Sequence, residues 1–314
     1  AKSIHRPIKI LVTALTHQAI DQILFKVART LDQKEKIPIW KYGRFAEAKL
    51  GVEPLQDAKP LMQNTSFILG ATGFGVYQLL EDKQFPRVFD WVIFDEASQV
   101  LPSYALLSLV FGKGNALFYG DTQQLAPIVT ADIPARSILA ELISRFSPQH
   151  RLRLNETYRM NDLICQFVSR HWYDQELQSS AADQRLELPS YPLFADSIDA
   201  YLDPAKPLVV VPVEHEGNLQ SSKEEALWIA QAVKRLTFDY SFSIDEIGII
   251  SLHRLQNNTI LNALKETLPF SIRHPKIDTV ERMQGQEFDL VLFSATVSDR
   301  ESLHSAFLKD YRRF

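Results

Sequence analysis

The stretch WVIFDEASQ, residues 91–99, decides the fold of this 314-residue chain. Four apolar residues lead directly into two carboxylates, Asp95 and Glu96. A short apolar run with polar residues behind it is typical of a buried strand in a parallel sheet. Open α/β sheets bind their ligands at the carboxyl ends of the strands, so we expect both acids at the functional edge of such a sheet.

Two interpretations of Asp95 and Glu96 follow from this position. In phosphate-loop ATPases, the first acid of such a pair orients Mg²⁺ and the second accepts a proton from the attacking water or positions it. Alternatively, the two acids begin the next helix, because negative charge is favourable at a helix N-terminus. The pair taken alone does not decide between these interpretations.

The same strand signal recurs along the chain and alternates with helical patterns, which predicts an α/β protein. The predicted strands are residues 9–14, 66–70, 91–96, 115–121, 150–154, 207–212, 247–251 and 289–294. Helices are predicted over residues 223–236 and 255–268. Another follows the first strand and has on one face Ile20, Ile23, Leu24, Val27 and Leu31. We also expect a small helical insertion within residues 45–62 and a surface excursion over residues 178–204. The pattern predicts two α/β domains in tandem, residues 1–154 and 155–314, with a hinge near Asn155.

A second polar turn, YGDTQQLAPIV at residues 119–129, follows the strand after Glu96. If the two strands are neighbours, Asp121 and an amide-bearing turn lie beside the acidic pair, and Gln124 is placed to sense a terminal phosphate. The alternative is a solvated loop that ends at Pro127. Two polar turns at neighbouring strand ends favour a ligand site.

Five segments together resemble motifs of superfamily 1B helicases, the group of the nonsense-mediated-decay helicase, senataxin and the replication nuclease-helicase. In chain order they are TALTHQAIDQIL (13–24), DEASQ (95–99), GDTQQLAPIV (120–129), ETYRMN (156–161) and ERMQGQEFDLVLFS (281–294). The resemblance implies two RecA-like domains, ATP and Mg²⁺ as cofactors, and single-stranded DNA or RNA as partner. It also implies translocation driven by ATP hydrolysis, with 5′ to 3′ polarity.

The resemblance assigns nucleotide-site roles by motif position. In the first domain, Asp95 would be the Mg²⁺ ligand, Glu96 the catalytic acid/base and Gln124 the phosphate sensor. In the second domain, Tyr158 would stack on adenine, Arg159 would contact the γ-phosphate and Glu287 would approach the ribose or phosphate.

Gly285 belongs to the same nucleotide-binding motif as Glu287, where it would permit a close turn. Two of the second-domain positions also have a simpler structural explanation. Tyr158 could instead be a buried hinge residue. Arg159 could be an exposed cation at a helix start, although the positive helix end disfavours it.

The resemblance also places Thr16, His17 and Thr72 on the sugar-phosphate chain of a bound strand, with Ser251 and Gln256 as further contacts in the second domain. Phosphate contacts of this kind bind a strand without reading its sequence. Lone Thr residues in loops are more commonly turn residues, so these assignments depend on the motif order. His253 replaces the aromatic residue that relatives carry, which puts base stacking there in doubt.

The chain contains no G-x-x-x-x-G-K-[ST] phosphate loop, and its Gly112–Lys113 pair precedes a strand instead of following one. The arginine-bearing helix that follows motif V in relatives is also missing. We therefore expect a fragment of a longer helicase that hydrolyses ATP poorly on its own. This leaves two alternatives open: a non-catalytic nucleic-acid-binding or scaffolding module, and a nucleotide-dependent switch.

Composition fits an intracellular enzyme. The net charge of −4 argues against a protein that simply coats polyanions. The single cysteine, Cys165, excludes internal disulfides, and we expect it to pack in the core. No segment is long and apolar enough to cross a membrane. We expect a monomer.

Overall fold

The computed structural model describes residues 7–31, 37–44, 51–81, 87–127, 136–181, 183–188 and 197–313. The chain divides into two compact units, Ala1–Leu152 and Arg153–Phe314. This division falls two residues before the predicted domain boundary. Each unit has its own parallel sheet and its own hydrophobic core.

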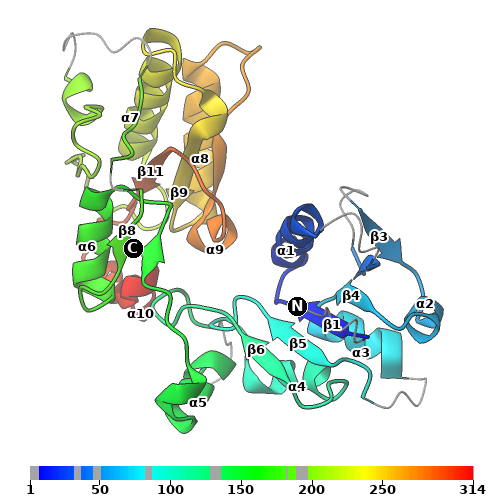
Figure 1. Cartoon of the computed structure of the whole chain (residues 1–314). Helices are drawn as coiled ribbons and strands as arrows, with labels where there is room; N and C mark the ends of the chain where they lie inside the picture. Colours follow the sequence, from blue (N-terminus) through cyan, green and yellow to red (C-terminus); the bar gives the residue numbers. More distant parts are fainter. Residues whose placement is uncertain are drawn as a thin grey trace. The chain divides into compact units, whose positions relative to one another are not determined.

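The first unit is built on a six-stranded parallel sheet with the order β3-β2-β4-β1-β5-β6 (Figure 1). Its strands are β1 Lys9–Thr13, β2 Ile39–Tyr42, β3 Val52–Leu55, β4 Phe67–Gly70, β5 Trp91–Phe94 and β6 Ala116–Phe118. Because the strands are parallel, their carboxyl ends, and the loops that follow them, share one edge of the sheet.

Helices cover both faces of this sheet because successive side chains of a strand point to opposite faces. The helices are α1 His17–Thr30, α2 Lys59–Gln63, α3 Gly73–Leu80, α4 Pro102–Leu109 and α5 Ile138–Arg145. On β1, Val12 belongs to the core under α1, with Ile20 and Leu24. Its neighbour Leu11 belongs to the core that contains α3 and α4. The two cores hold the central strands, and with them the loops at the carboxyl edge, in fixed positions.

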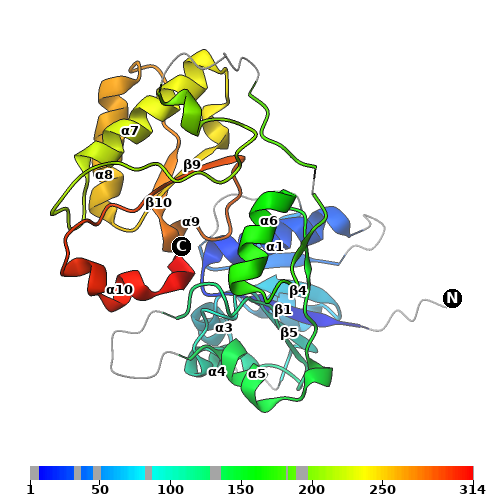
Figure 2. The same ribbon diagram turned by 90° about the vertical axis from the view of Figure 1, so that its left-hand side faces the viewer.

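The second unit is built on a parallel sheet of three strands in the order β10-β9-β11, with a separate β7-β8 pair. Its strands are β7 Glu156–Thr157, β8 Gln178–Ser179, β9 Ile247–Ser251, β10 Lys276–Thr279 and β11 Leu290–Ser294. Its helices are α6 Asp162–Trp172, α7 Lys223–Lys234, α8 Arg254–Thr267, α9 Val280–Met283 and α10 Ala306–Lys309. Figure 2 shows α7 and α8 packed together beside β9 and β10, around a core that includes Val233, Ile249 and Leu264.

The structure confirms the α/β fold and most predicted elements, and it corrects three predictions. Residues 207–212 form no strand; the segment bends at its start and is then irregular, with Leu208 and Val210 largely exposed. Residues 151–155 are irregular, so no strand precedes the hinge. The predicted helical insertion contains β3, which pairs with β2, before the short α2; residues 45–50 lie outside the described residues.

Two single-residue predictions can also be compared with the structure. Cys165, on α6, is 2% exposed, as core packing requires, and burial raises the pKa of its thiol. None of the described helices is long and apolar enough to cross a membrane.

Candidate functional site

Asp95 and Glu96 follow β5 in a tight turn at the carboxyl edge of the first sheet. The Asp95 backbone N–H donates to the carbonyl of Thr13 on β1, at 2.9 Å, which ties the turn to the neighbouring strand. The next helix, α4, begins only at Pro102. The alternative in which the two acids begin a helix is therefore wrong.

The loops after β5 and β6 lie against each other, as predicted for neighbouring strands. The two strands pair in parallel, and the Ala97 N–H donates to the Tyr119 carbonyl at 2.8 Å. A Cβ atom on Gly120 would lie 2.9 Å from the backbone nitrogen of Ser98. Only a residue without a side chain fits this approach, so Gly120 brings the second polar turn against the acidic turn.

Glu96 has a left-handed backbone conformation, with φ of 51°. This region is unfavourable for a residue with a Cβ atom, and such strain persists only where the surrounding structure imposes it. The hydrogen bond from the Gln99 N–H to the Glu96 carbonyl, at 2.9 Å, helps to close the turn. A strained carboxylate at a strand end is a feature often found at functional sites.

Burial raises the pKa of Asp95, while a hydrogen bond from the Glu96 backbone and the more distant charge of Lys26 oppose that rise. The ionised Asp95 carboxylate is therefore incompletely compensated by the protein. A cation beside it would supply the missing compensation.

The second polar turn is organised by Asp121. Its Oδ1 accepts the Gln123 backbone N–H at 2.9 Å, and its Oδ2 accepts the Gln124 side-chain amide at 3.1 Å. Gln124 is exposed, so its side chain lies at the protein surface. The sequence predicted Asp121 and Gln124 beside the acidic pair, and the two turns do lie together.

The donor set fits Mg²⁺ held mainly by a nucleotide. Within the described ranges, no group of three His, Cys, Asp or Glu side chains could hold a metal by itself. Mg²⁺ commonly takes one or two protein carboxylates and completes its shell with water and substrate phosphates. Asp95 could serve as such a ligand, whereas both carboxylate oxygens of Asp121 already accept hydrogen bonds.

Thr16 and Thr72 both cap helices at the same edge of the sheet. The Thr16 hydroxyl accepts the Ala19 N–H at the start of α1, and the Thr72 hydroxyl accepts the Gly75 N–H at the start of α3. Thr16 is exposed and Thr72 is half-buried. Both residues are thus helix caps, as the turn explanation predicted. The N-termini of α1 and α3 that they cap lie at this edge, where backbone N–H groups favour anions.

In the second unit, the structure brings Arg159 and Glu287 together. The Arg159 Nε donates to Glu287 Oε1 at 3.0 Å, and a second nitrogen of the guanidinium pairs with the same oxygen. Gly285 has φ of 78°, which makes the turn that presents Glu287. Tyr158 is 74% exposed, so the alternative of a buried hinge tyrosine is wrong.

Ser251 and Gln256 do not reach the surface, which corrects their prediction as strand contacts. Both are fully buried. The Gln256 amide accepts the Ser222 N–H at 2.7 Å and donates to the Ser222 carbonyl and to Ser294 Oγ, so its hydrogen-bonding capacity is used inside the unit. The Ser251 hydroxyl bonds to the carbonyl of His253 and the amide of Asn257.

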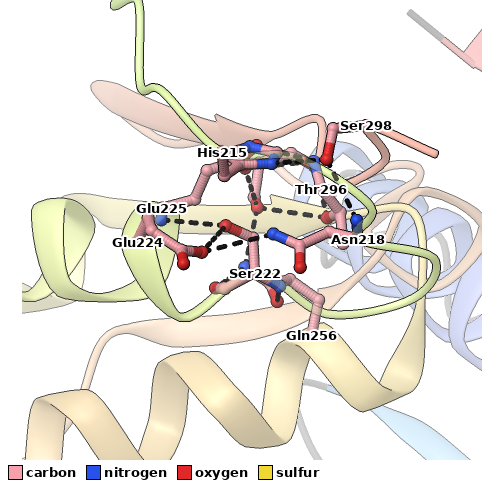
Figure 3. A network of polar contacts seen from close by, with 9 residues as sticks. His215, Asn218, Ser222, Glu224, Glu225, Gln256, Thr296 and Ser298 are labelled. Carbon is pink, nitrogen blue, oxygen red and sulfur yellow. Dashed lines mark hydrogen bonds and ion pairs between the residues drawn. The ribbon is translucent and has the colours of Figure 1, made fainter. Parts of the chain in front are cut away.

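The contacts of Gln256 belong to a larger polar network at the carboxyl edge of the second sheet, centred on Glu225 of α7 (Figure 3). The Glu225 carboxylate accepts the Thr296 backbone N–H at 2.9 and 3.0 Å, the Ser294 hydroxyl, and a hydrogen bond from His215 Nε2 at 2.8 Å. Thr296 is fully buried with φ of 69°. The network therefore fixes the loop that follows β11 in an unfavourable backbone conformation.

His253 stacks on Phe307, with ring centroids 5.3 Å apart and planes inclined by 22°. Together with Asn218 and Leu255 these two rings line a groove of about 600 Å³. The His253 ring is thus already stacked on another ring of the same unit.

Two family models match this chain, one after the other. Models of the AAA domain match residues 61–132 and 135–314. The DNA replication ATP-dependent helicase/nuclease DNA2 of Homo sapiens is 26% identical across 97% of this chain, and its counterpart in Schizosaccharomyces pombe is 28% identical across 97%. The Regulator of nonsense transcripts 1 homolog of Neurospora crassa is 26% identical across 71% of the chain.

The chain belongs to the AAA-domain family of superfamily 1B helicases. It spans only 31%, 23% and 21% of the length of those three relatives, respectively. Superfamily 1B membership confirms the resemblance that the five ordered segments indicated.

Lys41 and Glu225 are enclosed charged residues that were not predicted from the sequence. Lys41 on β2 is fully buried, and Glu225 on α7 is nearly so. Lys41 stands between apolar neighbours in PIWKYG, where a charge inside a strand was a usable signal. Glu225 stands in SSKEEAL at a helix start, where an acid is commonplace, so nothing in the sequence distinguishes it.

Proposed function

We propose that this chain forms the core of an ATP-dependent helicase that binds Mg²⁺-ATP and moves along single-stranded DNA or RNA. The observation that carries the proposal is the contact between the two polar turns after β5 and β6, with a strained glutamate and an incompletely compensated aspartate. The relatives are named as ATP-dependent helicases, which supports the same activity. We infer a monomer that works inside the cell and moves 5′ to 3′.

In this proposal, the two acids of the first unit divide the chemistry of hydrolysis. Asp95 would hold Mg²⁺, whose charge favours the ionised carboxylate that burial disfavours. When bound, Mg²⁺ neutralises charge on the phosphates. Glu96 would accept the proton of the attacking water, and Gln124 would exchange its hydrogen bond with Asp121 for one with the terminal phosphate.

Arg159 would supply positive charge from the second unit. Its ion pair with Glu287 is more than half exposed on both sides and contributes at most about 1 kcal/mol. A triphosphate carries more charge than one carboxylate and offers several acceptor oxygens, so it can displace Glu287 from the guanidinium. Glu287 would then be free for the ribose or phosphate edge, with Tyr158 stacked on adenine.

The strand would cross the carboxyl edge of the first sheet, at Thr16, His17 and Thr72. The helix N-termini that the two threonines cap supply donors to phosphate oxygens without reading bases. In the second unit, exposed groups other than Ser251 and Gln256 must make the contacts, because those two side chains are enclosed.

We propose no residue that binds the β-phosphate, since the 314 residues contain no G-x-x-x-x-G-K-[ST] segment. We therefore expect the chain by itself to hydrolyse ATP slowly. Robust turnover stimulated by nucleic acid, in an ATPase assay on these residues alone, would contradict this expectation.

Fluorescence anisotropy with a labelled oligonucleotide tests the proposed function. The chain should bind single-stranded dT20 or rU20, and a nonhydrolysable ATP analogue with Mg²⁺ should change the affinity. In a version extended with a phosphate-binding loop, Glu96→Gln should keep strand binding and lower turnover at least about 100-fold, the effect of losing a general base. Glu53→Gln on β3 is the matched control, because Glu53 is exposed and stands on a different strand from the acidic turn. Unchanged turnover in Glu96→Gln would refute the catalytic role.

The missing phosphate loop also favours a second candidate, a non-catalytic strand-binding module. In that case dT20 would bind with the same affinity with and without nucleotide. Nucleotide binding without any strand binding would instead indicate a switch.

A further inference from the structure

Lys41 is a lysine with no exposed surface, located on β2 at the carboxyl edge of the first sheet. Lysine is almost never fully buried unless its charge is paired, because removing an ammonium group from water is costly. A lysine in this position therefore has partners that hold it there.

The Lys41 ammonium group has three such partners. Its Nζ lies 3.0 Å from Asp21 Oδ1, 3.1 Å from His17 Nδ1 and 3.1 Å from the Arg44 carbonyl oxygen. An ammonium group has three N–H donors and no acceptor. His17 Nδ1 must therefore accept a hydrogen bond from Lys41, and it cannot carry a proton of its own.

The opposite nitrogen, Nε2, then carries the proton of the neutral ring. Burial and the charge of Lys41 lower the pKa of His17, Arg44 lowers it further and Asp21 opposes them, so the ring remains neutral at physiological pH. No partner of Nε2 occurs among the described residues. His17 thus presents one N–H donor to whatever lies beyond it.

Gly43 lies close to the His17 ring. It has φ of 92°, and a Cβ atom at this position would lie 2.9 Å from His17 Cε1. The backbone after β2 therefore lies against the imidazole while Lys41 holds its Nδ1. Lys41 thereby sets the tautomer of His17, and the backbone at Gly43 packs against the ring.

We propose that Lys41 is a positioning residue that holds His17 as a neutral Nε2–H donor to a phosphodiester oxygen of the bound strand. The proposal rests on the proposed strand-binding function. His17 is the first residue of α1, directly after the cap Thr16, so its donor stands beside the N–H groups of a helix N-terminus that favours anions. A neutral N–H donor makes this contact directional. Because it carries no charge, it adds little to the salt dependence of binding.

The competing explanation is that Lys41 only neutralises Asp21 inside the fold. A pair of variants separates the two explanations. Asp21→Asn removes the carboxylate but keeps an acceptor for Lys41, and it leaves the bond to His17 in place. Lys41→Met/Asp21→Asn removes the donor to His17 as well and leaves no unpaired buried charge that would prevent folding.

The tautomer is measured by ¹⁵N chemical shifts of histidine-labelled protein, with the His17 signals assigned through His17→Gln. The wild-type protein and Asp21→Asn should show an unprotonated Nδ1 and a protonated Nε2 at pH 7.5. Removing Lys41 in the Asp21→Asn background should raise the pKa of His17, because the positive charge that lowered it is gone. A protonated Nδ1 in the wild-type protein would overturn the proposal.

The consequence for binding is measured by dT20 anisotropy. Lys41→Met/Asp21→Asn should bind about three- to tenfold more weakly than Asp21→Asn, the loss of one well-placed hydrogen bond. Equal affinities of these two variants would overturn the positioning role while leaving the helicase proposal intact. If the wild-type chain shows the expected tautomer but binds no strand, both the proposed function and the delivery of this donor to a phosphate fail.

Discussion

The carboxyl edges of the two sheets carry polar residues in the same places along their strands, but they use them differently. In the first unit, Asp95, Glu96 and Thr16 remain partly or fully accessible after β5 and β1. In the second unit, Ser251 and Gln256 after β9 are fully enclosed. A polar residue that follows a buried strand in the sequence can therefore be placed at the carboxyl edge of the sheet. The sequence does not say whether its side chain contacts a ligand or stabilises a loop.

The difference follows from how each edge is made rigid. In the first unit, backbone hydrogen bonds to the Thr13 and Tyr119 carbonyls fix the acidic turn. In the second unit, the side chain of Glu225 fixes the loop after β11 by accepting the Thr296 N–H. Substitutions should consequently affect stability first in the second unit and function first in the first unit.

The largest expected effect is that of Glu225→Ala. It leaves the buried Thr296 N–H and Ser294 hydroxyl without their Glu225 acceptor and removes the partner of His215 Nε2, whose Nδ1 still contacts Ser298. Each unsatisfied buried group costs about 1–3 kcal/mol, so we expect the free energy of unfolding of the second unit to fall by about 3 kcal/mol. Hydrogen exchange measured by mass spectrometry resolves the two units, and the first unit serves as an internal reference.

The neighbouring residue provides the control for that prediction. Glu224 is exposed, although it accepts hydrogen bonds from Ser222 and Asn218. Glu224→Ala should leave exchange in the loop after β11 close to that of the wild-type protein. Equal loss of protection in both variants would mean that Glu225 is no more important than a surface acid.

Much of the fold could be predicted because buried parallel strands have a strong sequence signal. The strand at residues 247–251 was predicted with the bounds that the structure has. Residues 207–212 carry the same apolar signal but form no ladder, because strand pairing depends on distant residues. β2 was missed since Lys41 interrupts its apolar run, and β10 since KIDT is mostly polar.

The candidate site could be located from sequence, but its internal geometry could not. Motif order placed Asp95 and Gln124 at one edge, and the pairing of β5 with β6 brings their loops together. Motif order could not show that Gln256 points inward, because burial is set by the approach of Ser222 from a segment 34 residues away. The positive φ of Glu96 was equally invisible, since nothing in DEASQ requires it.

An intermediate effect of the opposite sign is expected for Glu96→Gly in the first unit. Glycine adopts positive φ without a steric penalty, so the substitution should stabilise this unit by about 1 kcal/mol, reduced by whatever contacts the carboxylate makes. Turnover in the extended version should nevertheless be lost. Urea unfolding of Glu96→Gly and Glu96→Ala separates the two effects, because alanine removes the carboxylate without relieving the backbone. If glycine is no more stabilising than alanine, the turn is not strained.

The smallest effect concerns pH and contrasts one acid from each unit. Burial raises the pKa of Asp95, so the folded state holds this proton more tightly than the unfolded chain, whose value is near 3.8. Its ionisation therefore destabilises the first unit as pH rises through the interval between these values, and Asp95→Asn should be more stable than wild type at neutral pH but not below that interval.

For Glu281 in the second unit, burial is outweighed by hydrogen bonds from its own backbone and Arg313, and its pKa is lowered. Its contribution is present at neutral pH and is lost as pH falls through the lowered value, so Glu281→Gln should be less stable than wild type at neutral pH and match it in acid. Hydrogen exchange of each unit, measured from neutral pH to below the interval of each acid, gives both differences. A stability difference of the same sign in both variants would show that the two units do not differ in how they stabilise a carboxylate.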